Sequence, residues 1–128
     1  MNDEMLLRIL GVDDEAHILS ALQRTFIDEP FEFMSALSGA EGLQMMQYGH
    51  EFDVIISDFK MPGMNGVEFL KNSMQLQPQA RRILLTGYAP DQEITAAISE
   101  GIISAVLAKP WDVNELIASI TNIKDEDI

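Results

Sequence analysis

One stretch near the middle of the chain, residues 52–66, places the tightest limit on how the chain can fold. It reads F-D-V-I-I-S-D-F-K-M-P-G-M-N-G, an apolar run that ends at Asp58 and gives way to Pro and Gly. A short apolar run closed by turn residues is typical of a buried strand. Asp58 would then stand at the carboxyl end of that strand, where open α/β sheets place their ligand sites. Asp58 is therefore a candidate functional carboxylate, although an aspartate at a strand end can also serve only to cap its loop.

Apolar runs alternate with amphipathic stretches along the rest of the chain. Further strands are predicted at residues 7–12, 31–36, 82–86 and about 103–108, and helices at about 15–27, 38–49, 65–78, 90–101 and 112–123. Three of these helices open on residue pairs with capping-box spacing, which are Ser38 with Glu41, Asn65 with Glu68, and Asp112 with Glu115. Strict alternation of strands and helices predicts right-handed crossovers and a parallel sheet covered on both faces.

The second strand differs from the others in its pattern. Residues 31–36, F-E-F-M-S-A, alternate partly between apolar and polar positions, which indicates a strand with one wetter face at an edge of the sheet. With that strand at the edge, the sequence predicts a single doubly wound (βα)5 domain of the α/β class with strand order 2-1-3-4-5. The length of 128 residues suits one such domain with a buried core.

Composition narrows the classes of function. The chain has 8 basic and 21 acidic residues, and this net charge of −13 argues against direct binding to a nucleic-acid backbone. It has no cysteine, which excludes disulfides and thiolate metal sites and permits a reducing compartment. No apolar stretch approaches the length of a membrane span. We therefore expect a cytoplasmic protein that does not bind the membrane.

Parallel strands bring their carboxyl ends to one edge of the sheet, and polar residues stand at those ends. Asp13 and Asp14 follow the first strand, Thr86 ends the fourth and Lys109 ends the fifth. Together with Asp58 they form a cluster of three carboxylates that repel one another and need a cation, and an oxygen-only cluster partly open to water suits Mg²⁺. Taken singly, these residues could be helix caps, a strand-end hydroxyl and a solvated lysine. Their shared edge favours a site.

Such a cluster can host phosphoryl transfer. A divalent ion and the Lys109 ammonium together neutralise three carboxylates, which makes room for an incoming phosphoryl group. A carboxylate can attack phosphorus when a metal and an ammonium neutralise the transferring oxygens. Asp58 is the best-placed nucleophile for this reaction.

Four separated motifs resemble those of a known family. V-D-D-E after the first strand, D-F-K-M-P-G-M-N-G after the third, L-T-G at the fourth and A-K-P at the fifth are similar to the receiver domain of two-component response regulators. The resemblance covers the whole chain as one domain, residues 1–128, with a core at about 6–123 and a short acidic tail. It implies a flavodoxin-like fold. It also implies a phosphoprotein that works in two-component signal transduction or a phosphorelay.

The resemblance assigns roles to the clustered residues. Asp58 would accept a phosphoryl group from a sensor histidine kinase, a phosphotransfer protein or a small phosphodonor. The implied Mg²⁺ ligands are Asp14, Asp58, the backbone carbonyl of Lys60 and, through water, Asp13. The implied phosphoryl ligands are Lys109, the Thr86 hydroxyl and the backbone amides of Phe59, Lys60 and Gly87. Lys109-Pro110 would be a cis peptide.

The resemblance also implies a switch, with one departure. Receivers usually carry Tyr or Phe three residues before the lysine, where this chain has Val106, so the aromatic half of the switch is in doubt. Thr86 could still move and reshape the surface of the fourth helix, fifth strand and fifth helix to control an output. Lys60 and Tyr88 stand at positions that modulate hydrolysis of the acyl phosphate in similar proteins. The domain would catalyse its own phosphorylation and dephosphorylation without being a conventional turnover enzyme.

Similar proteins often form homodimers through that same surface. In this chain Ile102, Ile103 and Val106 could support such a contact. The sequence shows no output region, so we expect either a stand-alone receiver or a receiver taken from a longer regulator.

Three other readings use the same residues differently. A phosphatase of the haloacid dehalogenase type would carry its D-x-D motif after the first strand, whereas the nucleophile here follows the third. A flavodoxin would need a phosphate-binding loop where this chain has Asp13, Asp14 and Glu15. A pseudo-receiver that binds partners without phosphorylation is the main alternative, because intact site residues do not guarantee their use.

Overall fold

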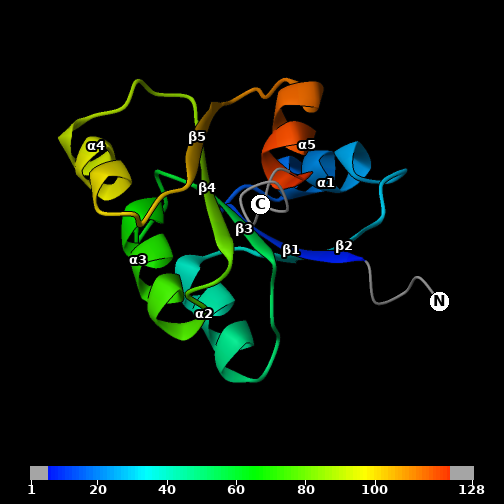
Figure 1. Cartoon of the computed structure of the whole chain (residues 1–128), viewed down its shortest axis with the longest axis horizontal. Helices are drawn as coiled ribbons and strands as arrows, with labels where there is room; N and C mark the ends of the chain where they lie inside the picture. The colour runs from blue at the N-terminus through cyan, green and yellow to red at the C-terminus, as the bar shows by residue number, and fades with distance from the viewer. Residues whose placement is uncertain (1–5, 122–128) are drawn as a thin grey trace.

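The computed structural model describes residues 6–121 and shows alternating strands and helices throughout. The elements are β1 (Leu7–Val12), α1 (Ala16–Thr25), β2 (Phe31–Ala36), α2 (Gly39–Gln47), β3 (Val54–Asp58), α3 (Gly66–Leu76), β4 (Arg81–Thr86), α4 (Gln92–Ser99), β5 (Ala105–Ala108) and α5 (Val113–Thr121). All neighbouring strands pair in parallel, in the order β2-β1-β3-β4-β5 (Figure 1). The predicted fold class, strand order and edge position of β2 are confirmed.

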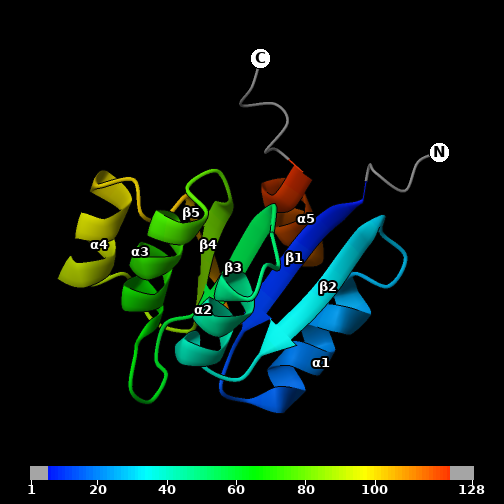
Figure 2. The ribbon, with the colours of Figure 1, turned by 90° about the horizontal axis from the view of Figure 1, so that it is seen from below.

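Helices cover both faces of the sheet. Helices α1 and α5 lie on one face, and α2, α3 and α4 lie on the other (Figures 1 and 2). Successive strand residues point to opposite faces, so the strands contribute side chains to two apolar clusters, one on each face of the sheet. Ile9, Ile56 and Leu85 belong to the cluster under α1 and α5, whereas Leu10 and Leu84 belong to the cluster under α2, α3 and α4. Burial on both faces explains the near-continuous apolar runs of the central strands.

Side-chain caps begin the helices at the residues that the sequence indicates. Asn65 forms a complete capping box: its side chain accepts a hydrogen bond from the Glu68 amide at 2.9 Å, and its own amide donates to Glu68 Oε1 at 2.9 Å. Ser38, Asp91 and Asp112 each accept one hydrogen bond from the amide three residues on. These caps fix where the helices start, on the same side of the sheet as the carboxyl ends of the strands.

The segment before β5 differs from the prediction. The strand begins at Ala105 and not at about 103, because the backbone amides of Ile102 and Ile103 both donate to the Ala97 carbonyl at the end of α4. Their side chains are only 4% and 3% exposed. The prediction that Ile102 and Ile103 offer a dimer surface is therefore wrong, since both belong to the core. Val106 is half-buried against the same cluster.

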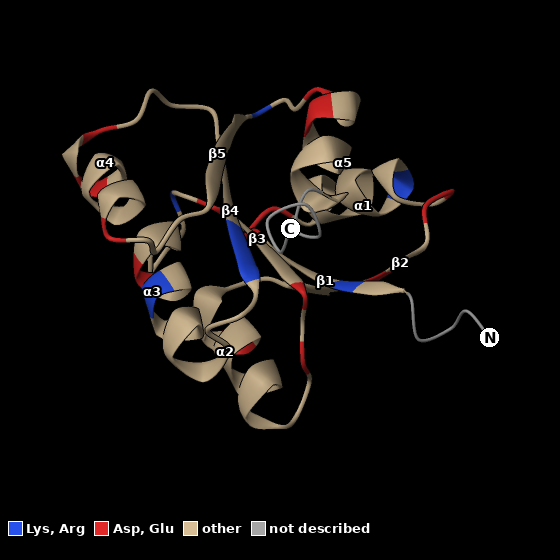
Figure 3. Ribbon diagram, viewed as in Figure 1, with Lys and Arg blue, Asp and Glu red and all other residues tan. Residues whose placement is uncertain are grey.

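Basic residues are few over the described part of the chain. Within residues 6–121, helices α2, α4 and α5 carry no Lys or Arg, while acidic residues stand at the starts of several helices (Figure 3). Between residues 6 and 121, no helix is long and apolar enough to cross a membrane. The cytoplasmic location stays a prediction. The predicted acidic tail and residues 122 and 123, where the fifth helix is predicted to end, lie outside the described residues.

A buried arginine, not foreseen from the sequence, stabilises the edge of the sheet opposite the carboxyl ends. The guanidinium of Arg82 donates to the carbonyls of Ala80 at 2.7 Å, Ile102 at 2.8 Å, Gly101 at 3.1 Å and Pro78 at 3.3 Å. Burial lowers the pKa of this guanidinium, but an arginine still keeps its proton at any ordinary pH. Arg82 thereby joins the start of β4 to the turn that follows α4.

Replacing Arg82 with Met should destabilise the fold. The apolar stem is kept, but buried carbonyls lose their donor, which costs roughly 2–4 kcal/mol in the free energy of unfolding. Urea denaturation would measure this loss. Lys71→Met, at an exposed position of α3, is the control and should change stability by less than about 0.5 kcal/mol. Equal stability of the Arg82 variant and this control would contradict the assignment.

Candidate functional site

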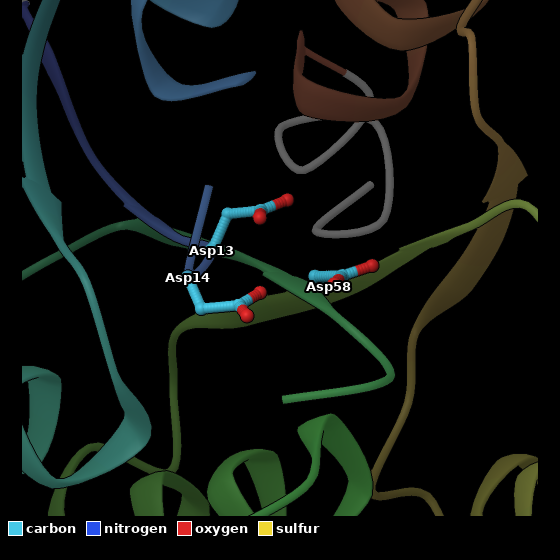
Figure 4. Close-up of side chains that lie close together, drawn as sticks. All are labelled: Asp13, Asp14 and Asp58. Atoms are coloured by element: carbon cyan, nitrogen blue, oxygen red, sulfur yellow. The ribbon is translucent and has the colours of Figure 1, made fainter. Parts of the chain in front are cut away.

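Three carboxylates meet at the carboxyl edge of the sheet. Asp13 and Asp14 follow β1 and Asp58 ends β3, and one carboxylate oxygen from each lies within 4.8 Å of the others (Figure 4). Asp13 is buried, Asp58 is half-buried and Asp14 is exposed. The structure thus brings together the carboxylates that the sequence places after two neighbouring strands.

Lys109, directly after β5, reaches across this edge to two of the carboxylates. Its ammonium donates to Asp13 Oδ2 at 2.9 Å and to Asp58 Oδ1 at 3.1 Å. The side chains of Lys109, Asp13 and Asp58 are 17%, 3% and 12% exposed, so these ion pairs are largely shielded from water. Burial alone would lower the pKa of Lys109, but the two carboxylates outweigh it and the pKa is raised. The peptide bond to Pro110 is cis, as the resemblance implies.

The surroundings of Asp58 raise its pKa above that of an ordinary aspartate. Burial raises the pKa of Asp58, the hydrogen bond from Lys109 opposes this rise, and the negative charge of Asp13 adds to it. The net direction is upward, because burial is the largest of these effects and Lys109 offsets only part of it. The donor set consists of oxygen atoms only and is open to water on the Asp14 side, which fits a hard divalent cation such as Mg²⁺.

A pocket of about 490 Å³ opens beside Asp58. Its lining consists of Asp14, Glu15, Asp58, Lys60, Gly87, Tyr88 and Lys109. Thr86 is buried at the end of β4, where its hydroxyl oxygen accepts a hydrogen bond from the Tyr88 amide at 3.1 Å. Phe59 is buried beside Asp58. All of the predicted site residues except Val106 therefore lie in or next to this pocket; Val106 packs into the core from β5.

Sequence reasoning missed how closely Gly66 packs against the backbone of Asp58. A Cβ atom on Gly66 would lie 2.1 Å from the Asp58 carbonyl oxygen, which is far too close for a Cβ atom and an oxygen that are not bonded to each other. The Gly66 amide also donates to the Phe59 carbonyl at 2.7 Å. Glycine at the first position of α3 thus lets the helix start pack directly against the backbone of Asp58. The N-G pair was visible in the sequence, but nothing local indicated which backbone it approaches.

A methyl group at Gly66 should disturb both the fold and the site. Alanine normally favours a helix over glycine, so any loss in Gly66→Ala measures the clash with Asp58, which we expect to cost about 1–3 kcal/mol. Thermal or urea unfolding would measure it. Gly87→Ala is the matched control, because its added Cβ would meet nothing closer than the Lys109 carbonyl at 3.5 Å. A Gly66→Ala protein as stable as the parent would refute this reading.

Two further contacts link the segment after Asp58 to a neighbouring segment. The Lys60 ammonium lies 4.3 Å from the centre of the Tyr88 ring. The Asn65 side-chain amide donates to both carboxylate oxygens of Glu93, in the first turn of α4, at 3.2 Å each. Each contact joins the segment after Asp58 to the segment after Thr86, and the spacing of these residues in the sequence gave no sign of either.

Comparison with known proteins identifies the family. The family model described as the response regulator receiver domain matches residues 9–121. The chain belongs to this family. Among curated relatives, the hydrogenase transcriptional regulatory protein HoxA of Cupriavidus necator is 36% identical over 112 residues, which make up 88% of this chain and 23% of HoxA. Sporulation initiation phosphotransferase F of Bacillus subtilis is 30% identical over 109 residues, covering 85% of this chain and 86% of that protein.

Solved receiver structures share the fold closely. The signal receiver domain of an HD domain-containing protein from Pseudomonas fluorescens matches with a TM-score of 0.85 and 35% identity, covering 94% of this chain and 96% of that one. A Thermotoga maritima response regulator in complex with Mg²⁺-BeF has a TM-score of 0.79 and 28% identity, covering 92% and 99%. A Burkholderia pseudomallei response regulator with a phosphorylated aspartic acid, calcium ion and citrate has a TM-score of 0.80 and 26% identity, covering 94% and 71%.

The family and the acidic triad together define what this receiver domain does. It acts as a phosphoacceptor switch in two-component signal transduction. In general terms, a receiver domain implies a histidine kinase or a phosphotransfer protein as its partner. The chain spans 23% of the length of HoxA, so the match to HoxA supports the receiver domain and not the activity of a whole regulator.

Proposed function

We propose that Asp58 is the phosphoacceptor of this receiver domain. One observation supports this assignment above the others: Lys109 holds Asp58 Oδ1 at 3.1 Å while also holding Asp13, and Asp58 and Lys109 both line the open pocket. A carboxylate oxygen of Asp58 would form the new bond to phosphorus. The bond from phosphorus to the donor would break, and its electron pair would leave with the imidazole of a phosphohistidine or with the acetate of acetyl phosphate.

Mg²⁺ is the cofactor that the donor set fits. We assign its binding to Asp14, Asp58 and the backbone carbonyl of Lys60, with Asp13 acting through a water molecule. When bound, the ion would neutralise negative charge on the transferring oxygens. Its positive charge would also offset the repulsion among the three carboxylates; after burial, the negative charge of Asp13 is the effect that raises the pKa of Asp58.

The chain's own groups complete the binding of the phosphoryl group. Lys109 would bind one phosphoryl oxygen through its ammonium, and Thr86 would donate its hydroxyl to another. The backbone amides of Phe59, Lys60 and Gly87 would supply further donors without a change of charge. Gly87 leaves room for this approach, because even a Cβ atom added there would lie 3.5 Å from its nearest neighbour, the Lys109 carbonyl oxygen.

The output of the switch is assigned to the surface of α4, β5 and α5. Thr86 would move toward the phosphoryl group and displace the turn before α4, while Val106 would contribute less than an aromatic residue does. A sensor histidine kinase or a phosphotransfer protein is the proposed donor. With a net charge of −13, we propose no direct nucleic-acid contact by this domain. A homodimer would have to use exposed residues of this surface other than Ile102 and Ile103.

Intact mass spectrometry after incubation with acetyl phosphate and Mg²⁺ tests the acceptor. The parent should gain the mass of one phosphoryl group, and Asp58→Asn should gain none, because an amide oxygen is a poor nucleophile. Asp112→Asn is the matched control, since Asn can keep the cap of α5, and it should react like the parent. Removal of Mg²⁺ with a chelator should abolish the gain in the parent. A folded parent that never gains mass would favour the pseudo-receiver reading instead.

Lys60 and Tyr88 are assigned to control of the phosphoryl lifetime. Both line the pocket beside Asp58, where a hydrolytic water would have to pass. The phosphorylated Lys60→Ala protein should therefore lose its phosphoryl group at a different rate from the parent. Decay followed by intact mass after removal of the donor would measure both rates, with Lys71→Ala as the control. Identical decay in all three proteins would remove Lys60 from this role.

A further inference from the structure

The contact between Lys60 and Tyr88 stands at the mouth of the site. A cation 4.3 Å from a ring centroid is attracted by the negative face of the ring. In the described part of the chain, Lys60 makes no ion pair with a carboxylate, although Asp14 and Asp58 line the same pocket. The ammonium of Lys109 already donates to Asp58 Oδ1. Lys60 is thus a cation at the pocket that is held by a ring and not by an anion.

Tyr88 has a second contact, and it also leads to the phosphoryl site. Its backbone amide donates to the Thr86 hydroxyl oxygen at 3.1 Å. The side chain is 58% exposed, and the residues on either side, Gly87 and Ala89, are exposed as well. Little packing therefore holds this turn. The two contacts that fix Tyr88 both come from residues at the place where a phosphoryl group would bind.

Phosphorylation would add a negative charge to the site, and the Lys60 ammonium can neutralise it. A divalent ion and Lys109 balance the three carboxylates of the unphosphorylated site. A phosphoryl group turns the singly charged carboxylate of Asp58 into a doubly charged acyl phosphate, so one uncompensated negative charge appears. An ion pair with a partly buried phosphoryl group is stronger than a cation over an exposed ring. The ammonium of Lys60 should therefore leave the ring for the phosphoryl oxygens.

We propose that Lys60 and Tyr88 form a latch that a phosphoryl group on Asp58 opens. The ammonium moves from the ring to the phosphoryl group, and the Thr86 hydroxyl turns away from the Tyr88 amide. The Tyr88 ring is then released at the start of α4. This inference rests on the proposed role of Asp58 as phosphoacceptor. It gives the chain an aromatic side chain that responds to phosphorylation, although the usual position in β5 holds Val106.

NMR spectroscopy of the full chain can follow the latch directly. A ring shifts the signals of protons above its face upfield, so the ε-methylene signal of Lys60 should be displaced in the free protein. Addition of Mg²⁺ and beryllofluoride, a phosphoryl analogue, should abolish this displacement, whereas Mg²⁺ alone should leave it. In Tyr88→Leu the Lys60 signal should take its ordinary position in both states.

The chain offers an internal control for the ring. It contains two tyrosines, and Tyr48, at the end of α2, is 77% exposed and remote from the pocket lining. Ring signals of Tyr88 should move on loading, and those of Tyr48 should not. Tyr48→Leu should keep the Lys60 displacement of the parent. In Lys60→Gln, the Tyr88 ring signals of the free protein should already differ from those of the free parent.

Each outcome decides between the latch and the phosphoacceptor role beneath it. If the amide signals of Asp58 and Thr86 report a bound analogue but the Lys60 signal stays displaced, the latch is wrong and the phosphoacceptor role stands. A free parent whose Lys60 signal matches that of Tyr88→Leu also overturns the latch. If neither the analogue nor acetyl phosphate engages Asp58, the phosphoacceptor role fails and the latch fails with it.

Discussion

Repulsion among three carboxylates at fixed backbone positions is the constraint on which the rest of this site depends. Asp13, Asp14 and Asp58 stand at the ends of two neighbouring strands, so the sheet holds their backbone positions close together. Lys109, which follows β5, relieves part of this repulsion by donating to Asp13 and Asp58, although β4 separates β5 from β3 in the sheet. Burial of such charges costs free energy, and a buried ion pair repays little of that cost. The cluster is therefore better explained by its chemistry than by any gain in stability.

The backbone around Asp58 is held as tightly as its side chain. The Ser57 hydroxyl donates to the Asp58 carbonyl at 2.8 Å, and Gly66 packs against the same carbonyl. The capping box of Asn65 and Glu68 then fixes the start of α3 immediately after this contact. Because the backbone is held on both sides of the turn, the position of Asp58 at the edge of the sheet is fixed before any ligand arrives. Such preorganisation would lower the cost of placing a carboxylate against phosphorus, in the role proposed for Asp58.

The sequence predicted most of the fold for a simple reason. Short apolar runs, amphipathic stretches and residue pairs at capping spacing are local signals, and in this chain they agree with one another. The carboxyl-edge cluster was also predictable, because parallel pairing brings strand ends together whatever the details of packing. The residues 102–103 show the limit of this reasoning: an apolar pair reads as strand, yet here its amides close the end of α4.

The contacts that sequence could not predict all depend on tertiary placement. The sequence presents Arg82 as an ordinary strand residue. Only the fold shows that the carbonyls of the turn after α4 lie within reach of its guanidinium. In the sequence, Gly66 is an ordinary glycine at the start of a predicted helix, and only the fold shows that the backbone of Asp58 lies against it. The pairing of Lys60 with Tyr88 depends on how two loops from different strand ends approach each other. No local pattern encodes such distances.

These unpredicted contacts also determine how α4 is held. At its C-terminal end, the guanidinium of Arg82 binds the carbonyls of Gly101 and Ile102 from a buried position. At its N-terminal end, the hydrogen bonds of 3.2 Å between Asn65 and Glu93 are the only ones among the described side chains that join α4 to the segment after Asp58. The helix buries only Ile94 and Ala97. Its N-terminal end is therefore the less constrained of the two, and this is the end that lies next to Thr86 and Tyr88.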